Sequence, residues 1–324
     1  MKYPELRLQR LRQTQSVRQW VNETHLNKTD FIMPLFISES ITHLHEVPSL
    51  PGVMQHTLDS MLSEVEEIAA AGITSVLLFG IPKSKDEEGS QAYNANGIVQ
   101  KAIRAIKQRF PQMIVIADCC LCAYTRNGHC GIMENGVLDN DRTLTTLGKV
   151  AASYANAGVD IVAPSGMMDG QVQAIRKSLD QAGKPMAAIL SYAVKYASSL
   201  YGPFRQASGS GEHFDGDRKH HQLAPGQARE ALREAQLDIQ EGADMLMIKP
   251  ALFYQDMIWR VRQETLLPIV AYNVSGEYSM LKMAAQAGLF DEKDIFREAF
   301  LGLKRAGADL IISYYAKEMA RGLA

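Results

Sequence analysis

All four cysteines of this 324-residue chain lie within residues 119–130. The segment begins where the apolar run 113–117 ends at Asp118. Buried structural cysteines are usually dispersed among several elements, whereas clustered thiols are typical of metal binding or redox chemistry. The spacing therefore predicts thiolate chemistry at the end of one strand, with metal binding as the favoured form.

The geometry of a strand sorts these thiols into two groups. If the chain stays extended past Asp118, side chains alternate, so Asp118, Cys120 and Cys122 share one face and Cys119 points away. Cys130 can return across an intervening turn. Three thiolates leave a fourth tetrahedral position open, which is typical of a catalytic zinc site.

Two readings of this segment remain open beside the zinc site. Cys119 and Cys122 form a C-x-x-C pair, but the thioredoxin-like context of that redox motif is missing. His129 is either a ligand or proton carrier, or an ordinary loop histidine.

Two lysines stand where chemistry is expected. Lys249 ends the apolar run 245–248, and a lysine in such a run must be paired or lose its proton. A neutral amine in a pocket attacks carbonyl groups and forms Schiff bases. Lys195 follows the predicted strand 186–192, and two nearby lysines would lower each other's pKa. The alternative for each is a lysine that extends to solvent or forms a structural salt bridge.

A long Gly/Ser-rich segment, 201–222, follows Lys195. Loops of this length in a compact domain are usually functional, so the segment is predicted to be an active-site lid. Arg205 and Arg218 within it suit bidentate capture of a substrate carboxylate. The alternative is a pair of solvated loop arginines.

The elements that must position these residues follow a repeat. Four times a predicted helix ends at glycine and a short apolar strand follows, which fits a left-handed cap before a strand buried on both faces. Four further apolar runs lack the glycine. The eight segments are 31–37, 71–80, 113–118, 157–165, 186–192, 241–250, 268–272 and 306–314.

Amphipathic helices are predicted between the strands, over 57–71, 97–109, 143–157, 168–182, 225–241, 254–264 and 278–287. This alternation predicts an α/β fold, a TIM barrel over 31–324, preceded by an extended N-terminal arm, 1–30, that suits an oligomer contact. A doubly wound open sheet is the alternative, although no Gly-rich phosphate loop follows the first strand. Catalytic groups of a barrel lie where strands end, here at Phe79, Asp118, Ser165, Tyr192, Lys195, Lys249, Tyr272, Ser275 and Tyr314.

Composition narrows the function classes. With 34 basic and 36 acidic residues the charge is balanced, so a nucleic-acid surface is not expected. No apolar run approaches the roughly 20 residues of a membrane helix, and residues 1–13 lack the apolar core of a signal peptide. A cytoplasmic location is expected, where disulfides are disfavoured.

Together these residues resemble the porphobilinogen synthase (5-aminolevulinate dehydratase) family over essentially the whole chain. The segments that carry the resemblance are 118–122 (DCCLC), 128–131 (GHCG), 191–198 (SYAVKYAS), 201–205 (YGPFR), 247–250 (MIKP) and 274–277 (VSGE). The family condenses two molecules of 5-aminolevulinate to porphobilinogen with loss of two waters.

The resemblance implies a role for each candidate residue. Lys249 would form a Schiff base with the first substrate molecule, and Lys195 would bind the ketone of the second. The second carboxylate would be held by Arg205 and Arg218, with Gln222 nearby. The first would be held by Ser275 and Tyr314, with Tyr272 nearby. Zinc on Cys120, Cys122 and Cys130 would polarise the second molecule, with Asp118 near for proton transfer.

The resemblance also implies regulation. Glu234 matches a glutamate that binds an allosteric magnesium and stabilises a homo-octamer in bacterial relatives, although a lone helical carboxylate is usually just solvated. Two departures stand out: Cys119 is an additional thiol, and His221 stands where relatives often carry tyrosine.

Two other functions compete with this one. A class I aldolase on the same barrel needs one lysine and no thiol cluster. A zinc-binding or redox-sensing protein without catalysis explains the thiols but not Lys195, Lys249 and the arginines.

Overall fold

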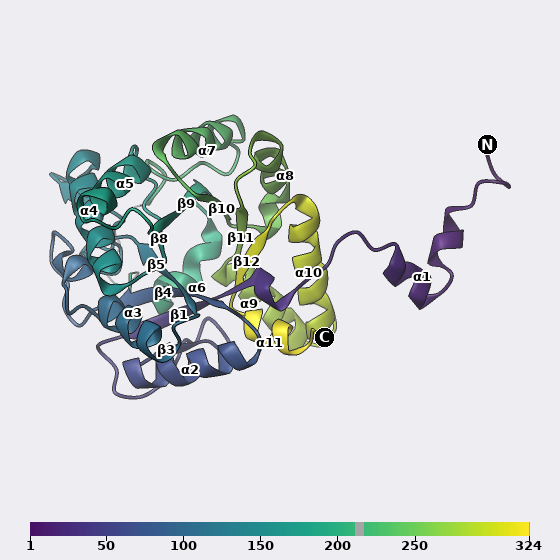
Figure 1. The fold of residues 1–324 in the computed structure, drawn as a ribbon, viewed down its shortest axis with the longest axis horizontal. Coiled ribbons are helices and arrows are strands. Elements are labelled where there is room, and N and C mark those ends of the chain that lie inside the picture. Colours follow the sequence, from purple (N-terminus) through teal and green to yellow (C-terminus); the bar gives the residue numbers. More distant parts are fainter. Residues whose placement is uncertain (211–216, 324) are drawn as a thin grey trace.

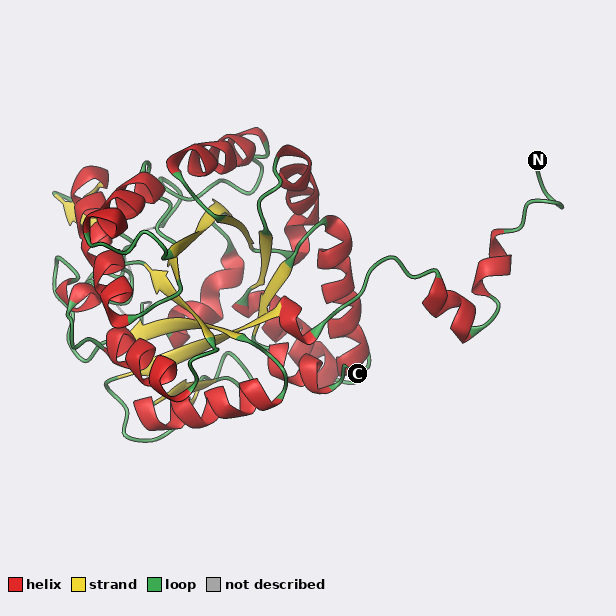
Figure 2. Ribbon diagram, in the orientation of Figure 1, coloured by secondary structure: helices red, strands yellow, loops and turns green. Residues whose placement is uncertain are grey.

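The computed structural model describes residues 1–210 and 217–323. Its centre is a closed barrel of eight parallel strands (Figure 2). The last strand pairs with the first through Phe31 and Ile311, so the predicted TIM barrel is confirmed and the open sheet is wrong. In spatial order the strands are β1 (Phe31–Ser38), β4 (Ser75–Ile81), β5 (Ile114–Cys119), β8 (Ile161–Pro164), β9 (Ala188–Lys195), β10 (Met245–Lys249), β11 (Ile269–Asn273) and β12 (Leu310–Ser313).

Helices surround the barrel and bury its outer face (Figure 2). The main ones are α2 (Leu58–Ala70), α3 (Ile98–Arg109), α4 (Asn140–Ala157), α5 (Gln171–Gln181), α7 (Arg229–Glu241), α8 (Gln255–Glu264), α9 (Ser275–Gln286), α10 (Glu292–Ala306) and α11 (Ala316–Arg321). The barrel strands are therefore covered on both faces, which explains their continuous apolar sequences.

The recurring glycine phrase has the same structural cause at three of its four sites. Gly158, Gly242 and Gly307 end their helices with φ of 99°, 103° and 115°, a conformation that favours glycine. Two residues after each of these glycines, an aspartate carboxylate accepts a hydrogen bond from a backbone N–H at the start of the neighbouring strand. These pairs are Asp160 with Val115 N, Asp244 with Ile189 N and Asp309 with Ile269 N. These hydrogen bonds link the N-terminal ends of neighbouring barrel strands.

Residues 1–30 leave the barrel and project away from it (Figure 1). They contain η1 (Leu8–Arg12), α1 (Gln15–Trp20) and η2 (Lys28–Asp30). An ion pair of 3.2 Å between Asp30 and Lys304 holds this segment where it joins the barrel. Beyond that point Trp20 is 87% exposed, and several other apolar side chains of the segment are also exposed.

Some elements of the structure have different boundaries from those predicted from the sequence. Strand β9 continues to Lys195 rather than ending at Tyr192, so the lysine is a strand residue. The predicted lid, 201–222, begins at the last residue of η4 (Ser199–Tyr201) and contains α6 (Gly202–Ala207), and its residues 211–216 lie outside the described part of the chain. Two short strands, β2 (His45–Glu46) and β3 (Met54–His56), extend the sheet beyond β1. Two others, β6 (Ile132–Glu134) and β7 (Val137–Asp139), form a separate hairpin.

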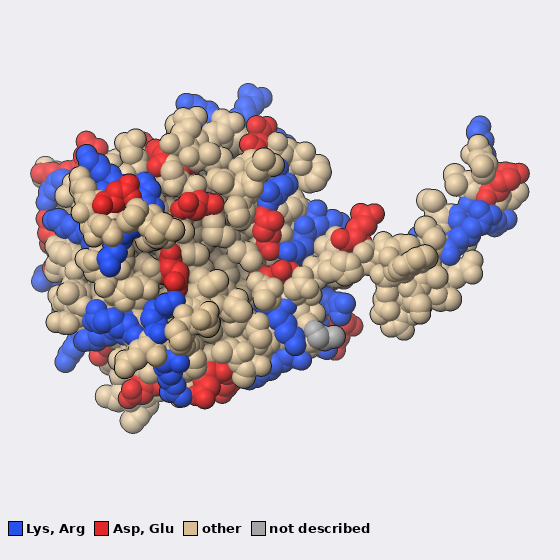
Figure 3. Space-filling model, in the orientation of Figure 1, with Lys and Arg blue, Asp and Glu red and all other residues tan. Residues whose placement is uncertain are grey.

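The surface agrees with the balanced composition. Basic and acidic side chains are intermixed over the face in Figure 3. Within the described residues no helix has both the length and the apolar character needed to cross a bilayer.

Candidate active site

Two lysines lie side by side at the C-terminal mouth of the barrel. Lys195 is the last residue of β9 and Lys249 the last of β10, and the two are partners in the strand register. Both are only 5% exposed. Lys195 Nζ donates a hydrogen bond of 2.5 Å to Ser165 O, just beyond β8. The barrel therefore fixes both amines by backbone pairing and orients one of them by a specific bond.

Aromatic rings surround the amine of Lys249. Its Nζ lies near four ring centroids, those of Tyr272 at 4.3 Å, Tyr192 at 5.0 Å, Phe204 at 5.0 Å and Tyr201 at 5.4 Å. Burial and then the charge of Lys195 lower the pKa of Lys249 to about 7, although Asp118 opposes them. A substantial share of the amine is therefore neutral near pH 7 and able to attack a carbonyl carbon.

Asp118, in β5, faces the lysines across the barrel mouth. Burial raises the pKa of its carboxyl group, while the charges of Lys249 and Lys195 pull it back down. Its Oδ1 is buried, and no described residue donates a hydrogen bond to that atom. Side-chain hydrogen bonds from Ser165 and Tyr192 also act on this carboxyl group and favour its charged form. A buried carboxyl group beside two lysines is suited to take or return a proton during a reaction.

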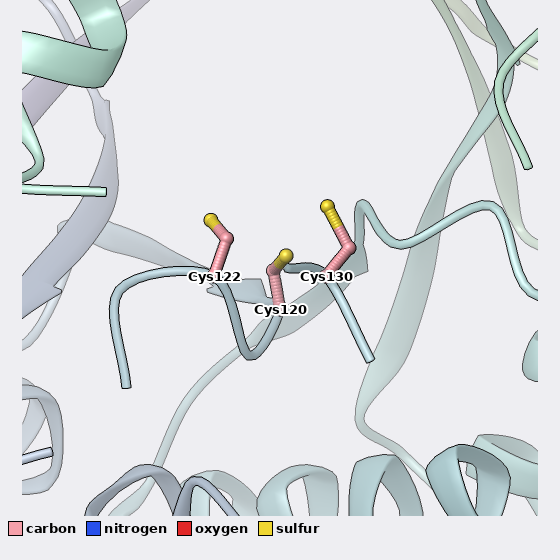
Figure 4. Close-up of side chains that lie close together, drawn as sticks. All are labelled: Cys120, Cys122 and Cys130. Carbon is pink, nitrogen blue, oxygen red and sulfur yellow. The ribbon is translucent and has the colours of Figure 1, made fainter. Parts of the chain in front are cut away.

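The structure brings Cys120, Cys122 and Cys130 together (Figure 4). Their sulfur atoms all lie within 4.8 Å of one another and all three residues are buried. Sulfur atoms sharing one tetrahedral zinc ion are about 3.8 Å apart, given a Zn–S distance of about 2.3 Å. Within the described residues no other set of three or more His, Cys, Asp or Glu side chains converges in this way.

The reason for this grouping differs from the expected one. The chain does not stay extended past Asp118, because β5 ends at Cys119 and a turn closed by Tyr124 N and Leu121 O follows. Cys119 does point away, as expected. Its thiol is fully buried and donates to Leu147 O of α4 at 3.7 Å.

A buried arginine balances the thiol site. Arg218 Nη2 donates to Gly128 O at 2.8 Å, in the loop that returns to Cys130. Hydrogen bonds from Cys120 and Cys122, with the charge of Arg218, hold the pKa of Cys130 well below its ordinary value. By contrast, hydrogen bonds within the cluster and then burial raise the pKa of Cys120 and of Cys122. Of the three sulfurs, Cys130 is therefore the one favoured as thiolate, the form that binds metal.

The described part of the predicted lid closes the barrel mouth. The Phe204 ring of α6 lies 5.1 Å from Phe79 and 5.7 Å from Phe36. Ser275 Oγ accepts a hydrogen bond from Phe204 N and donates one to Leu200 O, each 3.1 Å long. The cavity left beside Asp118, Cys120 and Phe204 is only about 10 Å³. A space of that size holds about one water molecule.

The remaining predicted residues fall in two places. Tyr272 and Tyr314 lie at the barrel mouth, with their hydroxyl oxygens 3.3 Å apart. Arg205 is half-buried on α6, near Arg218, whose charge adds to burial in lowering its pKa. Gln222 is buried, and its Nε2 has no hydrogen-bond partner among the described residues.

Glu234 lies outside this cluster. It lines a separate cavity of about 500 Å³ together with Asp169, Glu230, Gln222 and His221. Burial and then the neighbouring Asp169 and Glu230 raise the pKa of Glu234. The cavity joins the last residues of the lid to the carboxylates of α7.

Of the four rings that enclose Lys249, those of Tyr201 and Phe204 were given no role by the sequence. Tyr201 and Phe204 stand in the YGPFR segment, but only its arginine was given a function. The signal that pointed to them was their place directly after a lysine-bearing strand.

Comparison with known proteins agrees with this geometry. The family model described as Delta-aminolevulinic acid dehydratase matches residues 5–322. A protein of that name from Bacillus subtilis (strain 168) is 53% identical over 318 residues, covering 98% of each chain. One from Synechocystis sp. is 51% identical and covers 99% of each.

A solved structure is similar over the same range. The crystal structure of delta-aminolevulinic acid dehydratase (porphobilinogen synthase) from Toxoplasma gondii ME49, in complex with the reaction product porphobilinogen, aligns with a TM-score of 0.96. It is 43% identical and covers 98% of this chain and 91% of its own. The chain belongs to the delta-aminolevulinic acid dehydratase family and is an enzyme of the hydro-lyase class.

Proposed function

We propose that this enzyme condenses two molecules of 5-aminolevulinate to porphobilinogen, with loss of two waters, through Schiff bases on Lys249 and Lys195. The observation that carries the proposal is the buried lysine pair, in which Lys249 has a pKa of about 7. The relative from Toxoplasma gondii, whose structure holds porphobilinogen, supports the identity of the product.

Lys249 begins the reaction with the first substrate molecule. Its neutral nitrogen attacks the ketone carbon, the C–N bond forms, and the ketone oxygen leaves as water. The resulting imine is a better electron sink than a ketone, so the adjacent carbon becomes acidic enough for a weak base to deprotonate. The aromatic rings around Nζ exclude bulk water and keep the imine from hydrolysis.

Lys195 binds the ketone of the second molecule in the same way. Its position beside Lys249 brings the two substrate molecules into contact, which converts a reaction between two free molecules into one between held groups. The charges of both lysines act on the carboxyl group of Asp118, which places it near both amines, and it carries protons between the reacting groups.

Charged and polar groups at the mouth hold the carboxylates. Arg205 and Arg218 bind that of the second molecule, with Gln222 beside them. Ser275 and Tyr314 bind that of the first, with Tyr272 beside them. Because Ser275 also bonds to Leu200 and to Phe204, substrate binding there is coupled to the position of the lid.

Cys120, Cys122 and Cys130 would hold a zinc ion. Their fit rests on three buried sulfur atoms that lie within 4.8 Å of one another. Bound there, zinc supplies Lewis-acid polarisation of a substrate oxygen or nitrogen through its open fourth position.

Regulation is assigned to Glu234 and to the N-terminal arm. Magnesium prefers oxygen ligands and retains several waters, and Glu234 offers it a carboxylate in a polar cavity that Asp169 and Glu230 also line. The exposed apolar side chains of residues 1–30 fit contact with a second copy, and we assign the active form to a cytoplasmic homo-octamer. No nucleic-acid or membrane partner is proposed.

A single assay tests the reaction. The enzyme is incubated with 5-aminolevulinate and a thiol reductant, with and without a zinc chelator, and porphobilinogen is measured. Pyrrole formation that chelation abolishes and zinc restores is expected. Absence of pyrrole in the zinc-loaded enzyme contradicts the reaction, and product formation that a chelator leaves intact contradicts the zinc role.

A further inference from the structure

Glu277 is a fully buried carboxylate with no assigned part in the reaction. It lies in the first turn of α9 and is 0% exposed. Its two oxygens accept hydrogen bonds from different segments. Oε1 accepts from Leu252 N at 2.8 Å, and Oε2 accepts from Val274 N at 3.0 Å.

A buried polar network extends from this carboxylate to a third strand. Asn273 Nδ2, at the end of β11, donates to Glu277 Oε2 at 3.4 Å. Ser313 Oγ, at the end of β12, donates to Asn273 Oδ1 at 2.9 Å and accepts from Tyr315 N at 3.1 Å. Asn273 and Ser313 are also fully buried, so water does not replace these bonds.

Each segment of this network adjoins a residue of the first-substrate site. Leu252 lies three residues after Lys249, Val274 directly precedes Ser275, and Ser313 directly precedes Tyr314. Glu277 therefore joins the ends of β10, β11 and β12 at the point where their side chains meet. Small shifts between these three ends would move the amine relative to the groups that hold the substrate carboxylate.

The chemistry of the carboxylate favours a function beyond packing. Leu252 N, Val274 N and Asn273 Nδ2 are neutral amide groups, and a buried charge balanced only by amides costs stability. In agreement with this, burial raises the pKa of Glu277 to about 7. A glutamine of the same shape would avoid that cost, but it offers one acceptor oxygen instead of two.

We propose that Glu277 is the positioning residue of the first-substrate site, holding the Lys249 loop and the Ser275 helix start in one register through its two separate oxygens. This inference rests on the proposed Schiff base at Lys249. Replacing one oxygen by an amide group would release either Leu252 N or Val274 N, because an NH₂ group cannot accept from either.

The test compares two isosteric variants at opposite ends of the same barrel wall. Glu277→Gln disturbs the C-terminal ends of β10 and β11. Asp309→Asn is the matched control, since Asp309 accepts from Ile269 N and pairs with Arg262 at the N-terminal ends of β11 and β12. The whole enzyme is used, and thermal unfolding, kcat, KM and the rate of borohydride trapping of substrate on Lys249 are measured for each.

Both variants are expected to lower the melting temperature. Only Glu277→Gln is expected to slow trapping on Lys249 and lower kcat, by roughly ten- to a hundredfold, the effect of a displacement near 1 Å. Equal trapping rates and equal kcat in the two variants would overturn the inference. Wild-type enzyme with no label on Lys249 would instead contradict the proposed function.

A milder variant covers the case in which Glu277→Gln does not fold. Ser313→Ala removes the hydrogen bonds of Ser313 Oγ to Asn273 Oδ1 and from Tyr315 N, and leaves the bonds of Glu277 itself in place. It is expected to slow trapping severalfold while Lys195 remains able to bind the second molecule. An unchanged trapping rate in a folded Ser313→Ala enzyme would overturn the network.

Discussion

Lys195 and Lys249 are register partners on adjacent strands, yet their amines lie in different surroundings. Lys195 Nζ donates to a backbone carbonyl, whereas Lys249 Nζ faces four aromatic rings. The two lysine amines can therefore play different parts in the reaction. The strands fix the distance between them, and the neighbouring groups give each amine a different environment.

Removing the charge of Lys195 should change the titration of Lys249. The pKa of Lys249 is lowered first by burial and then by Lys195, so Lys195→Met should raise it. The pH profile of borohydride trapping on Lys249 should then shift to higher pH. Lys195→Arg keeps the positive charge and serves as the control. Its trapping profile should shift less than that of Lys195→Met. A profile that does not move in Lys195→Met would show that the repulsion is unimportant.

Three of the four thiols should bind the metal and the fourth should not. Ala at Cys120, Cys122 or Cys130 removes a sulfur from the converging set, so bound zinc should fall by at least tenfold at limiting metal. Cys119→Ala should bind zinc as the wild type does, because its thiol is turned toward Leu147 O. Metal content after dialysis checks this, and equal loss in Cys119→Ala would contradict the assigned ligands.

Asp238 should make stability depend on pH. Its carboxylate accepts from the Ser191 hydroxyl at 2.5 Å, and burial raises its pKa from 3.8 to about 7. Between these values the folded protein holds a proton that the unfolded chain has lost, so stability falls as pH rises through this window.

Asp238→Asn removes that titration. Its unfolding free energy should vary less with pH than the wild type between 4 and 7, by on the order of a few kcal/mol. Urea unfolding at several pH values measures this. Parallel curves for the two proteins would show that Asp238 does not titrate in the window.

Magnesium should act through Glu234. Glu234→Ala should lose magnesium activation, while Glu298→Ala, an exposed carboxylate on α10, should keep it. Activity and sedimentation are measured against magnesium concentration in zinc-loaded enzyme. Full activation of Glu234→Ala would place the ion elsewhere.

The sequence predicted the barrel because its period is local: a glycine cap, then an apolar strand. It predicted the two lysines and three thiols because charge or sulfur at a strand end stands out against apolar residues. It did not predict that the chain turns right after Cys119, since the turn residues 121–124 carry no strong turn signal.

Other features depend on contacts between distant segments. Phe204 lies over Lys249 because α6 folds back across the mouth, and Ser275 bonds to that segment from 71 residues away. Glu277 reads as an ordinary acidic residue near a helix start. Only the joined ends of β10, β11 and β12 give it a role.

The central claim is that Lys249 carries the first Schiff base. Wild-type enzyme, Lys249→Met and Lys195→Met are incubated with 5-aminolevulinate and borohydride, and the reduced adduct is located by peptide mass spectrometry. The account predicts label on Lys249 in the wild type and in Lys195→Met. It also predicts loss of that label and of turnover in a folded Lys249→Met. Substantial turnover in Lys249→Met, or label confined to Lys195, would contradict it.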